Sequence, residues 1–463
     1  MDRTSWGKTG ASLLACAAIF GLNTPLASAQ DAGGLNVTAD VLSSLTVDDN
    51  ADLDVESEGT TTDFDTRLTL GVTGGSATSR FEAELGGSIA FEDRPGGEQE
   101  DNGFVDPFAA LRFDAEGVNS EFGVNLRVRE TEVRSSFFVD EDGDFIADDL
   151  IVDEGDLLDT RATLTFSVGV NSPLGADFRI SRRERDYTDT VDPNLFDRAT
   201  DTARAAVNIR LSPLATASLI GTYREYDAED AIETNIQTTG LGVGLRFDFT
   251  PVLRFDGEVL TNEFETTESG VTTEEDNQTS GFLRLTRELP DGEVRFEARS
   301  DASSTTNRTT LSADREIEVG GSEIGYGLGF TDSDTGDSAL LVNLNFGRDL
   351  PLGRVSAELD QRAVINDDEE EVLRTRVALG LLREIGEQSA IDVSLSVADV
   401  EDIGNGLASE ATRTEFQIGL RRQIFEQWDW TLAYRARIEN EPGVDTAQSN
   451  AIITTIGRTF SLR

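Results

Sequence analysis

Histidine is absent from this 463-residue sequence, and cysteine and methionine occur once each. Histidine is the commonest general base of enzymes, so no serine–histidine or cysteine–histidine nucleophile can be assembled from this chain. Zinc and copper sites are disfavoured as well, since their usual imidazole and thiolate ligands are missing. A pair of carboxylates could still hydrolyse a glycosidic bond, but among 88 acidic residues no pair stands out. The composition therefore predicts that the protein is not an enzyme.

Basic residues are also scarce. Lysine and arginine together number 39 against 88 aspartates and glutamates, which gives a formal net charge of −49. Nucleic acid is therefore excluded as a partner, because its recognition depends on a basic surface. No apolar run reaches the roughly 18 residues of a membrane-spanning helix. No linker or break in composition divides the chain, so we expect one continuous domain after the leader.

The N-terminus has the three parts of a secretory signal peptide. A basic start with Lys8 precedes an apolar run, Ala11–Leu22, and a small-residue exit, Ala27-Ser28-Ala29. We expect cleavage after Ala29, so that residues 1–29 are removed and residues 30–463 remain. Cys16 lies in the apolar run, so the mature chain would contain no cysteine. The protein is predicted to be exported, and if it enters a membrane it must cross with strands.

Apolar and polar residues alternate with a period of two from Leu35 onward. In Gly240–Glu263, leucine, valine and phenylalanine alternate with glycine, arginine and acidic residues on both sides of a turn at Pro251. This period indicates β-strands with one apolar and one polar face. A unit of strand, tight turn, strand and acidic loop then repeats along the chain.

Ten tight turns rich in glycine and proline join these strands in pairs, as turn geometry requires. Besides Pro251 they are Gly74-Gly75-Ser76, Glu116-Gly117-Val118-Asn119, Ser172-Pro173-Leu174-Gly175, Ser212-Pro213-Leu214, Pro290-Asp291-Gly292, Gly320-Gly321-Ser322, Leu350-Pro351-Leu352-Gly353, Ile385-Gly386-Glu387 and Ile424-Phe425-Glu426-Gln427. Longer, mostly acidic segments separate the pairs: Glu92–Gly103, Thr266–Gln278, Asn366–Glu371 and Asp402–Ala411.

Short turns alternating with longer loops are typical of a transmembrane barrel with periplasmic turns and extracellular loops. Ten hairpins plus unpaired first and last strands predict about 22 strands, within a range of about 20 to 24. The expected fold is therefore all-β: a single antiparallel up-and-down barrel over residues 30–463. A soluble propeller is the alternative, but it should show a blade repeat, and none is visible.

Aromatic residues fall near the expected strand ends, as two interfacial girdles would require. Those beside the short turns are Phe247, Phe249, Phe346, Trp428 and Trp430, and those beside the loops are Phe91, Tyr187, Tyr223 and Phe264. The alternative is that aromatic side chains simply terminate buried strands.

The polar face of the strands carries many charges, which we expect to line the lumen. Charges facing lipid at mid-membrane would cost about 2–4 kcal/mol for each arginine, whereas those facing the lumen can be hydrated or paired. Each of them could equally be a structural ion pair that braces the wall. The predicted lumen-lining residues are Arg127, Arg129, Arg204, Arg210, Arg246, Asp256, Glu258, Arg284, Arg295, Glu297, Arg299, Glu358, Arg362, Arg374, Arg376, Glu415, Arg421, Arg435 and Arg437.

The last strand carries an insertion pattern. Thr455, Gly457, Phe460 and Leu462 have the spacing polar-x-Gly-x-x-aromatic-x-apolar just before the chain end at Arg463. This resembles the C-terminal signal of Gram-negative outer-membrane β-barrels. The resemblance implies an outer-membrane location, contact with lipid and lipopolysaccharide, and recognition by the barrel assembly machinery. The last strand should pair with a first strand near Val37–Thr46, because closure removes both sheet edges.

One acidic loop is similar to the calcium loops of thrombospondin type 3 repeats and EF-hands. Asp140, Asp142, Asp144 and Asp148 match ligand positions, although Phe145 replaces the usual glycine. The resemblance implies a calcium site, and the alternative is a solvated acidic loop.

The expected function is that of an outer-membrane channel, porin-like, for passive diffusion of small hydrophilic solutes, with acidic loops favouring cations. An export component for exopolysaccharide, or a structural acidic surface barrel, is the alternative. TonB-dependent receptors resemble this size but carry a plug domain before the barrel. Because the first strand begins by Leu35, we expect no plug domain. The long loop Ser135–Asp159 is the segment able to fold into the lumen. The oligomeric state is left open.

Overall fold

A computed structural model describes residues 34–462 except residues 58, 96–102, 134–149, 151–152, 154, 305, 366–369, 405–409, 426, 441–442 and 444, and except the side chains of residues 274–277. The expected signal peptide, residues 1–29, lies outside the described residues. No helix in the described part is long and apolar enough to cross a membrane.

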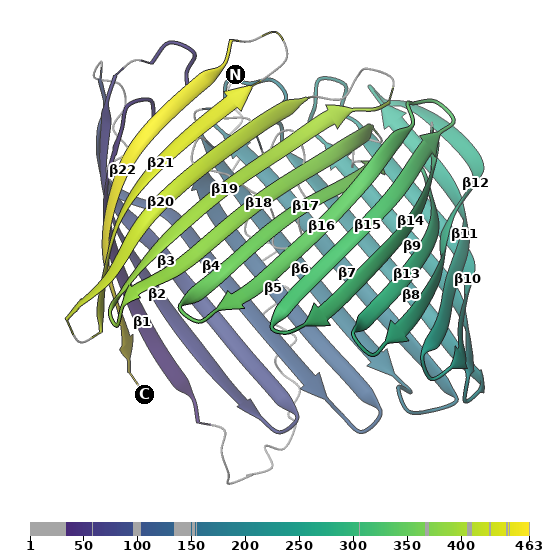
Figure 1. Ribbon diagram of the computed structural model, residues 1–463. Coiled ribbons are helices and arrows are strands. Elements are labelled where there is room, and N and C mark those ends of the chain that lie inside the picture. The colour runs from purple at the N-terminus through teal and green to yellow at the C-terminus, as the bar shows by residue number, and fades with distance from the viewer. Residues whose placement is uncertain are drawn as a thin grey trace. The chain divides into compact units, whose positions relative to one another are not determined.

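The described chain forms 22 β-strands, which Figure 1 labels in order. They are β1 (Asn36–Asp48), β2 (Thr61–Ser76), β3 (Ser79–Asp93), β4 (Gly103–Glu116), β5 (Ser120–Glu132), β6 (Asp156–Val168), β7 (Leu174–Thr188), β8 (Arg198–Ser212), β9 (Ala215–Ala228), β10 (Asn235–Thr250), β11 (Leu253–Glu268), β12 (Val271–Leu289), β13 (Gly292–Ala302), β14 (Asn307–Val319), β15 (Ser322–Ser333), β16 (Ala339–Leu350), β17 (Gly353–Ile365), β18 (Glu371–Gly386), β19 (Ser389–Asp402), β20 (Ala411–Phe425), β21 (Trp428–Asn440) and β22 (Ala447–Ser461).

Each strand pairs in antiparallel fashion with the next, and β1 pairs with β22, so the sheet closes into a barrel (Figure 1). The expected count of about 22 strands and all ten tight turns are confirmed. The closing pair runs from Thr38 opposite Ser461 to Asp48 opposite Ala451, as the last-strand pattern predicts. Closure leaves no edge strand whose backbone groups would face lipid unpaired.

One predicted loop is wrong. The segment Thr266–Gln278 is not a loop, since β11 continues to Glu268 and β12 begins at Val271. Only Ser269 and Gly270 lie between them, both with positive φ (49° and 76°), which gives a tight turn. Threonine and glutamate dominate this segment, and their polarity suggested a loop. The side chains nevertheless continue the period of two of β11 and β12, which extend to the tight turn.

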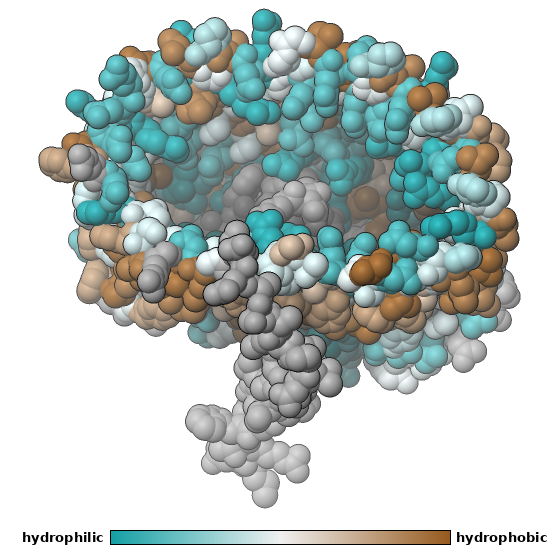
Figure 2. All heavy atoms as spheres, turned by 90° about the horizontal axis from the view of Figure 1, so that it is seen from below, coloured by the Kyte–Doolittle hydropathy of each residue, from teal (hydrophilic) through white to brown (hydrophobic). Residues whose placement is uncertain are grey.

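The barrel wall has an apolar outer face and a polar inner face. Leu241 and Val243 on β10 are 66% and 61% exposed and point outward, as the alternation predicts. Figure 2 shows hydrophilic side chains around the hollow interior and hydrophobic side chains on the outer wall. Such a wall suits a bilayer outside and a wet lumen inside.

The aromatic residues beside the short turns all lie on the outer face, whereas only some of those beside the loops do. Phe249, Phe91 and Tyr223 are exposed on the outer face. Phe264, by contrast, is 4% exposed on the inner face, and Tyr187 packs against an inner cluster that contains Leu157. These two rings lie on the inner wall near the loops. There the cluster against which Tyr187 packs also contains Leu195, which lies in the connection between β7 and β8.

Candidate functional site: the inner wall and its extracellular mouth

The strand register places every predicted lumen-lining residue on the inner face. Residues opposite each other in neighbouring antiparallel strands share a face. Arg246 lies opposite Asp256, which lies opposite Arg284, which in turn lies opposite Glu297. Following such pairs around the barrel reaches all members of the predicted set. Their part in solute passage stays a prediction.

The inner face of β5 to β8 is dominated by arginine, which we call the arginine wall. The arginines are Arg127, Arg129, Arg161, Arg179, Arg183, Arg185, Arg198, Arg204 and Arg210, and the acids on the same face are Glu121, Asp159 and Asp177. The chain as a whole has a formal charge of −49, so this wall is a local reversal of sign. A concave surface of one sign raises the local concentration of ligands of the opposite sign.

Asp159 is the acid at the centre of the arginine wall. Its Oδ1 lies 2.7 Å from Arg161 Nε, and its Oδ2 lies 3.2 Å from Arg183 Nη2 and 3.5 Å from Arg185 Nε. Three guanidinium groups thus surround one buried carboxylate. Arg127 and Arg179, in contrast, are exposed to the lumen without an ion pair among the described residues. The wall therefore presents positive charge to anything that enters.

Sequence reasoning missed the middle of this wall. Arg179, Arg183 and Arg185 on β7 share one strand face by their spacing of two and four, which is a readable signal. The intervening Arg182 points outward and pairs with Glu184 and Asp201, so the run of charges obscured the alternation.

On the neighbouring inner face of β1 to β4, acids outnumber arginines, and this face contains a cavity of about 350 Å³ near the loops. Asp63 lies directly opposite Glu92 across β2 and β3, an unfavourable pairing of like charges. Arg435 and Arg437 line the other side of the cavity. Negative and positive groups therefore face the same space, which can hold a small polar ligand that bears charge.

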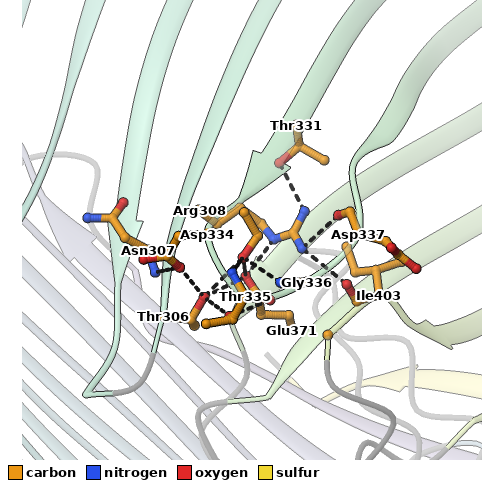
Figure 3. Close-up of polar contacts among 12 residues, drawn as sticks. Thr306, Asn307, Arg308, Thr331, Asp334, Thr335, Gly336, Asp337, Glu371 and Ile403 are labelled. Atoms are coloured by element: carbon orange, nitrogen blue, oxygen red, sulfur yellow. Dashed lines mark hydrogen bonds and ion pairs between the residues drawn. The ribbon is translucent and has the colours of Figure 1, made fainter.

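A buried ion pair, Arg308 with Glu371, lies at the mouth on the loop side (Figure 3). Arg308 Nε lies 3.0 Å from Glu371 Oε1, and the two side chains are 1% and 3% exposed. Arg308 also donates to Thr331 and to the carbonyl oxygens of Asp337 and Ile403. This network joins β14, β15 and β18 to two loops. Neither charged residue was singled out from the sequence, because nothing local in the chain marks which arginine will be buried.

The long loop between β5 and β6 reaches the far wall, as its length allowed us to expect. Leu150 in that loop is 0% exposed and packs with Val372, Ala398, Val400 and Ala411 on the inner faces of β18 to β20. Asp140, Asp142, Asp144 and Asp148, the predicted calcium ligands, lie outside the described residues. Among the residues that are described, no group of three or more acids is placed to hold a metal ion.

The insertion pattern divides between the two faces of β22. Thr455 and Gly457 face inward opposite Ser44 and Leu42, whereas Phe460 and Leu462 lie on the outer set. Outward-facing Arg458 lies 4.5 Å from the centre of the Phe460 ring and 5.8 Å from that of Trp428. This cation–π cluster at the short-turn end keeps a charged group at the membrane interface.

No protein-family model and no curated protein matches the chain. Solved structures do match its fold. The ferric-catecholate import receptor Fiu from E. coli K12 is 11% identical with a TM-score of 0.55, covering 93% of this chain and 82% of that one. The FrpB iron transporter from Neisseria meningitidis is 8% identical with a TM-score of 0.58, covering 92% and 81%. The copper transporter OprC is 11% identical with a TM-score of 0.52, covering 92% and 80%.

These comparisons establish the fold: the chain is a β-barrel of the Gram-negative outer membrane, built like the barrels of TonB-dependent receptors. The similar proteins are transport receptors and not enzymes, in agreement with the composition. The outer membrane as location agrees with this fold, and lipid contact follows from the apolar outer wall.

Two expectations are corrected by the same comparisons. The expectation of a barrel without a plug domain is wrong as a description of the fold type, because the matched barrels belong to plug-containing receptors. The physical reason is width: barrels of about 22 strands enclose a lumen that outer-membrane transporters fill with a plug. The expectation of a porin-like passive channel, with export or a structural role as its alternative, is likewise overturned, since the matched structures are iron and copper receptors and transporters.

Proposed function

We propose that this barrel belongs to a receptor that imports an anionic metal chelate across the outer membrane. The observation that carries the proposal is the arginine wall, a strongly basic inner surface in a chain whose formal net charge is −49. Three of the similar structures are a ferric-catecholate import receptor, an iron transporter and a copper transporter.

Recognition of the chelate as a whole, and not of the bare metal ion, fits the composition. The chain has no histidine, one cysteine and one methionine, so soft or imidazole ligation of a naked ion is not available to it. Arginine recognises the carboxylate or catecholate oxygens of a ligand through charge-assisted, often bidentate hydrogen bonds. Arg127 and Arg179, which are exposed to the lumen, would provide the first such contacts.

The test uses ferric enterobactin as the probe, with the purified barrel in detergent and binding followed by calorimetry. The double variant Arg127→Gln/Arg179→Gln should weaken binding by at least about tenfold, since two charge-assisted contacts are lost. Arg421→Gln is the control for position, because it removes one positive charge from an exposed inner site on β20, outside the arginine wall. An equal loss in both variants, or no loss in the double variant, would contradict the proposal.

A further inference from the structure

The ladder between β16 and β17 is broken on the loop side. These strands pair from Leu350 opposite Gly353 to Leu344 opposite Leu359, and there the pairing ends although both strands continue. Beyond that point side chains replace the ladder: Val342 N donates to Gln361 Oε1 at 3.1 Å, and Gln361 N donates to Asn343 Oδ1 at 2.9 Å. The two strands are therefore held apart by amide side chains, and we call this place the seam.

The segments beyond the seam fold toward the lumen. We call Gln361–Ile365 of β17 and Glu371–Thr375 of β18 the inner flap; they stay fully paired with each other. Leu373 and Ala363 of the flap belong to the outward-facing alternation, yet they pack in one buried cluster with Leu341, which faces inward on β16. The outer face of the flap thus lies against the inner face of its neighbour.

The flap is held in this position by the buried ion pair of Figure 3. Glu371 Oε1, at the flap's β18 end, accepts from Arg308 Nε at 3.0 Å, Thr306 Oγ1 at 3.0 Å and Ser333 Oγ at 2.5 Å. Its backbone oxygen accepts from Ile403 N at 3.0 Å. All three side-chain donors come from β14, from the connection before it and from β15. One carboxylate therefore fastens the flap to a separate part of the wall.

The physical character of this fastening differs from the rest of the barrel. Backbone ladders join the flap's strand β18 to both β17 and β19, and breaking such ladders is costly in a membrane. Toward β16, the described contacts of the flap are two side-chain hydrogen bonds and one small apolar cluster, and the ion pair fastens it to β14. On its other side the flap stays paired with β19, and Val372 packs in the cluster around Leu150. When a buried ion pair loses one partner, the other charge is left buried and uncompensated. Removing either Arg308 or Glu371 should therefore strongly weaken the attachment of the flap.

We propose that the inner flap is a gate at the extracellular mouth, and that Arg308 and Glu371 form its latch. When the latch is released, the flap swings outward, the seam closes toward an ordinary ladder and the mouth widens. A packed element with two stable positions can turn the loss of one local contact into a discrete opening movement. The gate stands on these contacts alone and does not depend on which ligand the barrel binds.

Thiol labelling tests the gate directly. Ala363→Cys places a single thiol on the covered face of the flap, in residues 30–463 expressed without Cys16. In liposomes, a membrane-impermeant maleimide should label this thiol slowly, and about a hundredfold faster when Glu371→Gln is added, because labelling follows the population of the open state. Asp360→Asn is the matched control: it makes the same charge change on β17, but its ion pair with Arg362 is partly exposed (24% and 55%), so labelling should change less than about twofold.

A disulfide across the seam supplies the converse experiment. Asn343→Cys with Gln361→Cys replaces two residues that touch in the closed state. Oxidation should hold the flap in place and keep the conductance of the Glu371→Gln barrel low in planar bilayers, and a reductant should raise it. If Glu371→Gln does not insert, Thr306→Val changes no charge, removes the hydroxyl that donates to Glu371 and Asp334, and should still speed labelling about fivefold. Labelling of Ala363→Cys that is unchanged by either latch variant would overturn the gate.

Discussion

Asp48 on β1 and Arg437 on β21 lie 389 positions apart in the chain, yet Arg437 Nη2 lies 3.0 Å from Asp48 Oδ2. The two strands are not neighbours, because β22 lies between them, and Ser449 of β22 donates to the same carboxylate at 2.6 Å. Both charged side chains are almost fully buried on the inner face. This contact fastens β1 to β21 across β22, beside the pair of strands that closes the barrel.

Removal of Asp48 should therefore destabilise the closed barrel. Asp48→Ala leaves Arg437 buried without its carboxylate, and we expect a loss of about 3–5 kcal/mol in the free energy of unfolding. Asp301→Ala is the control, since its ion pair with Arg299 is largely exposed and should contribute less than about 1 kcal/mol. Urea titration of the refolded barrels in lipid vesicles measures both values. Similar losses for the two variants would show that burial of the pair does not matter.

Truncation of the last strand should abolish insertion. Deletion of residues 460–463 removes Phe460 and Leu462 from the outer face of β22 and takes away the pairing of Phe460 with Ala39. The barrel would then keep an open edge, which the membrane does not tolerate. Fractionation should find the truncated chain in the periplasm, and recovery of a normal amount from the outer membrane would refute the role of this pattern. Recognition by the barrel assembly machinery remains a prediction.

Two glycines at short turns should respond very differently to alanine. Gly353 has a φ of +151°, and a β-carbon there would overlap the carbonyl oxygen of Leu382 in the adjacent strand. Gly386, at another short turn, has no atom within 4 Å of that position. We expect Gly353→Ala to cost about 1–3 kcal/mol and Gly386→Ala to be nearly neutral. Thermal unfolding of both variants in the same detergent provides the comparison, and equal stability would contradict the strain argument.

Adjacent residues on β19 should separate the lipid face from the lumen face. Leu395 lies on the outer set, whereas Ser396 lies inward opposite Glu415 of β20. Leu395→Arg should lower the free energy of unfolding by about 2–4 kcal/mol, because the charge would enter the bilayer core. Ser396→Arg should change it little, since the new guanidinium would meet water and a carboxylate. Equal effects in refolding titrations would mean that these two faces have been assigned the wrong way round.

Much of the fold could be predicted from the sequence because its signals are local. Alternation along Leu241, Val243 and Leu245 defines a strand with one apolar face, and glycine and proline mark the turns. These features repeat along the chain, so the strand count, the closing pair and the inner set of charges could all be worked out. The exception, Thr266–Gln278, was a segment whose polarity outweighed its alternation.

The absence of histidine and the excess of acids determined, from sequence alone, which chemistry the protein does not perform. Only the tertiary structure decided which charges meet. Arg308 reaches Glu371 over 63 positions, and Asp159 gathers three arginines from two strands. Period-two alternation assigns a residue to a face, but it contains no information on how far a strand leans from its neighbour. The arginine wall, the seam and the inner flap depend on register and curvature across the whole barrel, and those emerge only when the sheet closes.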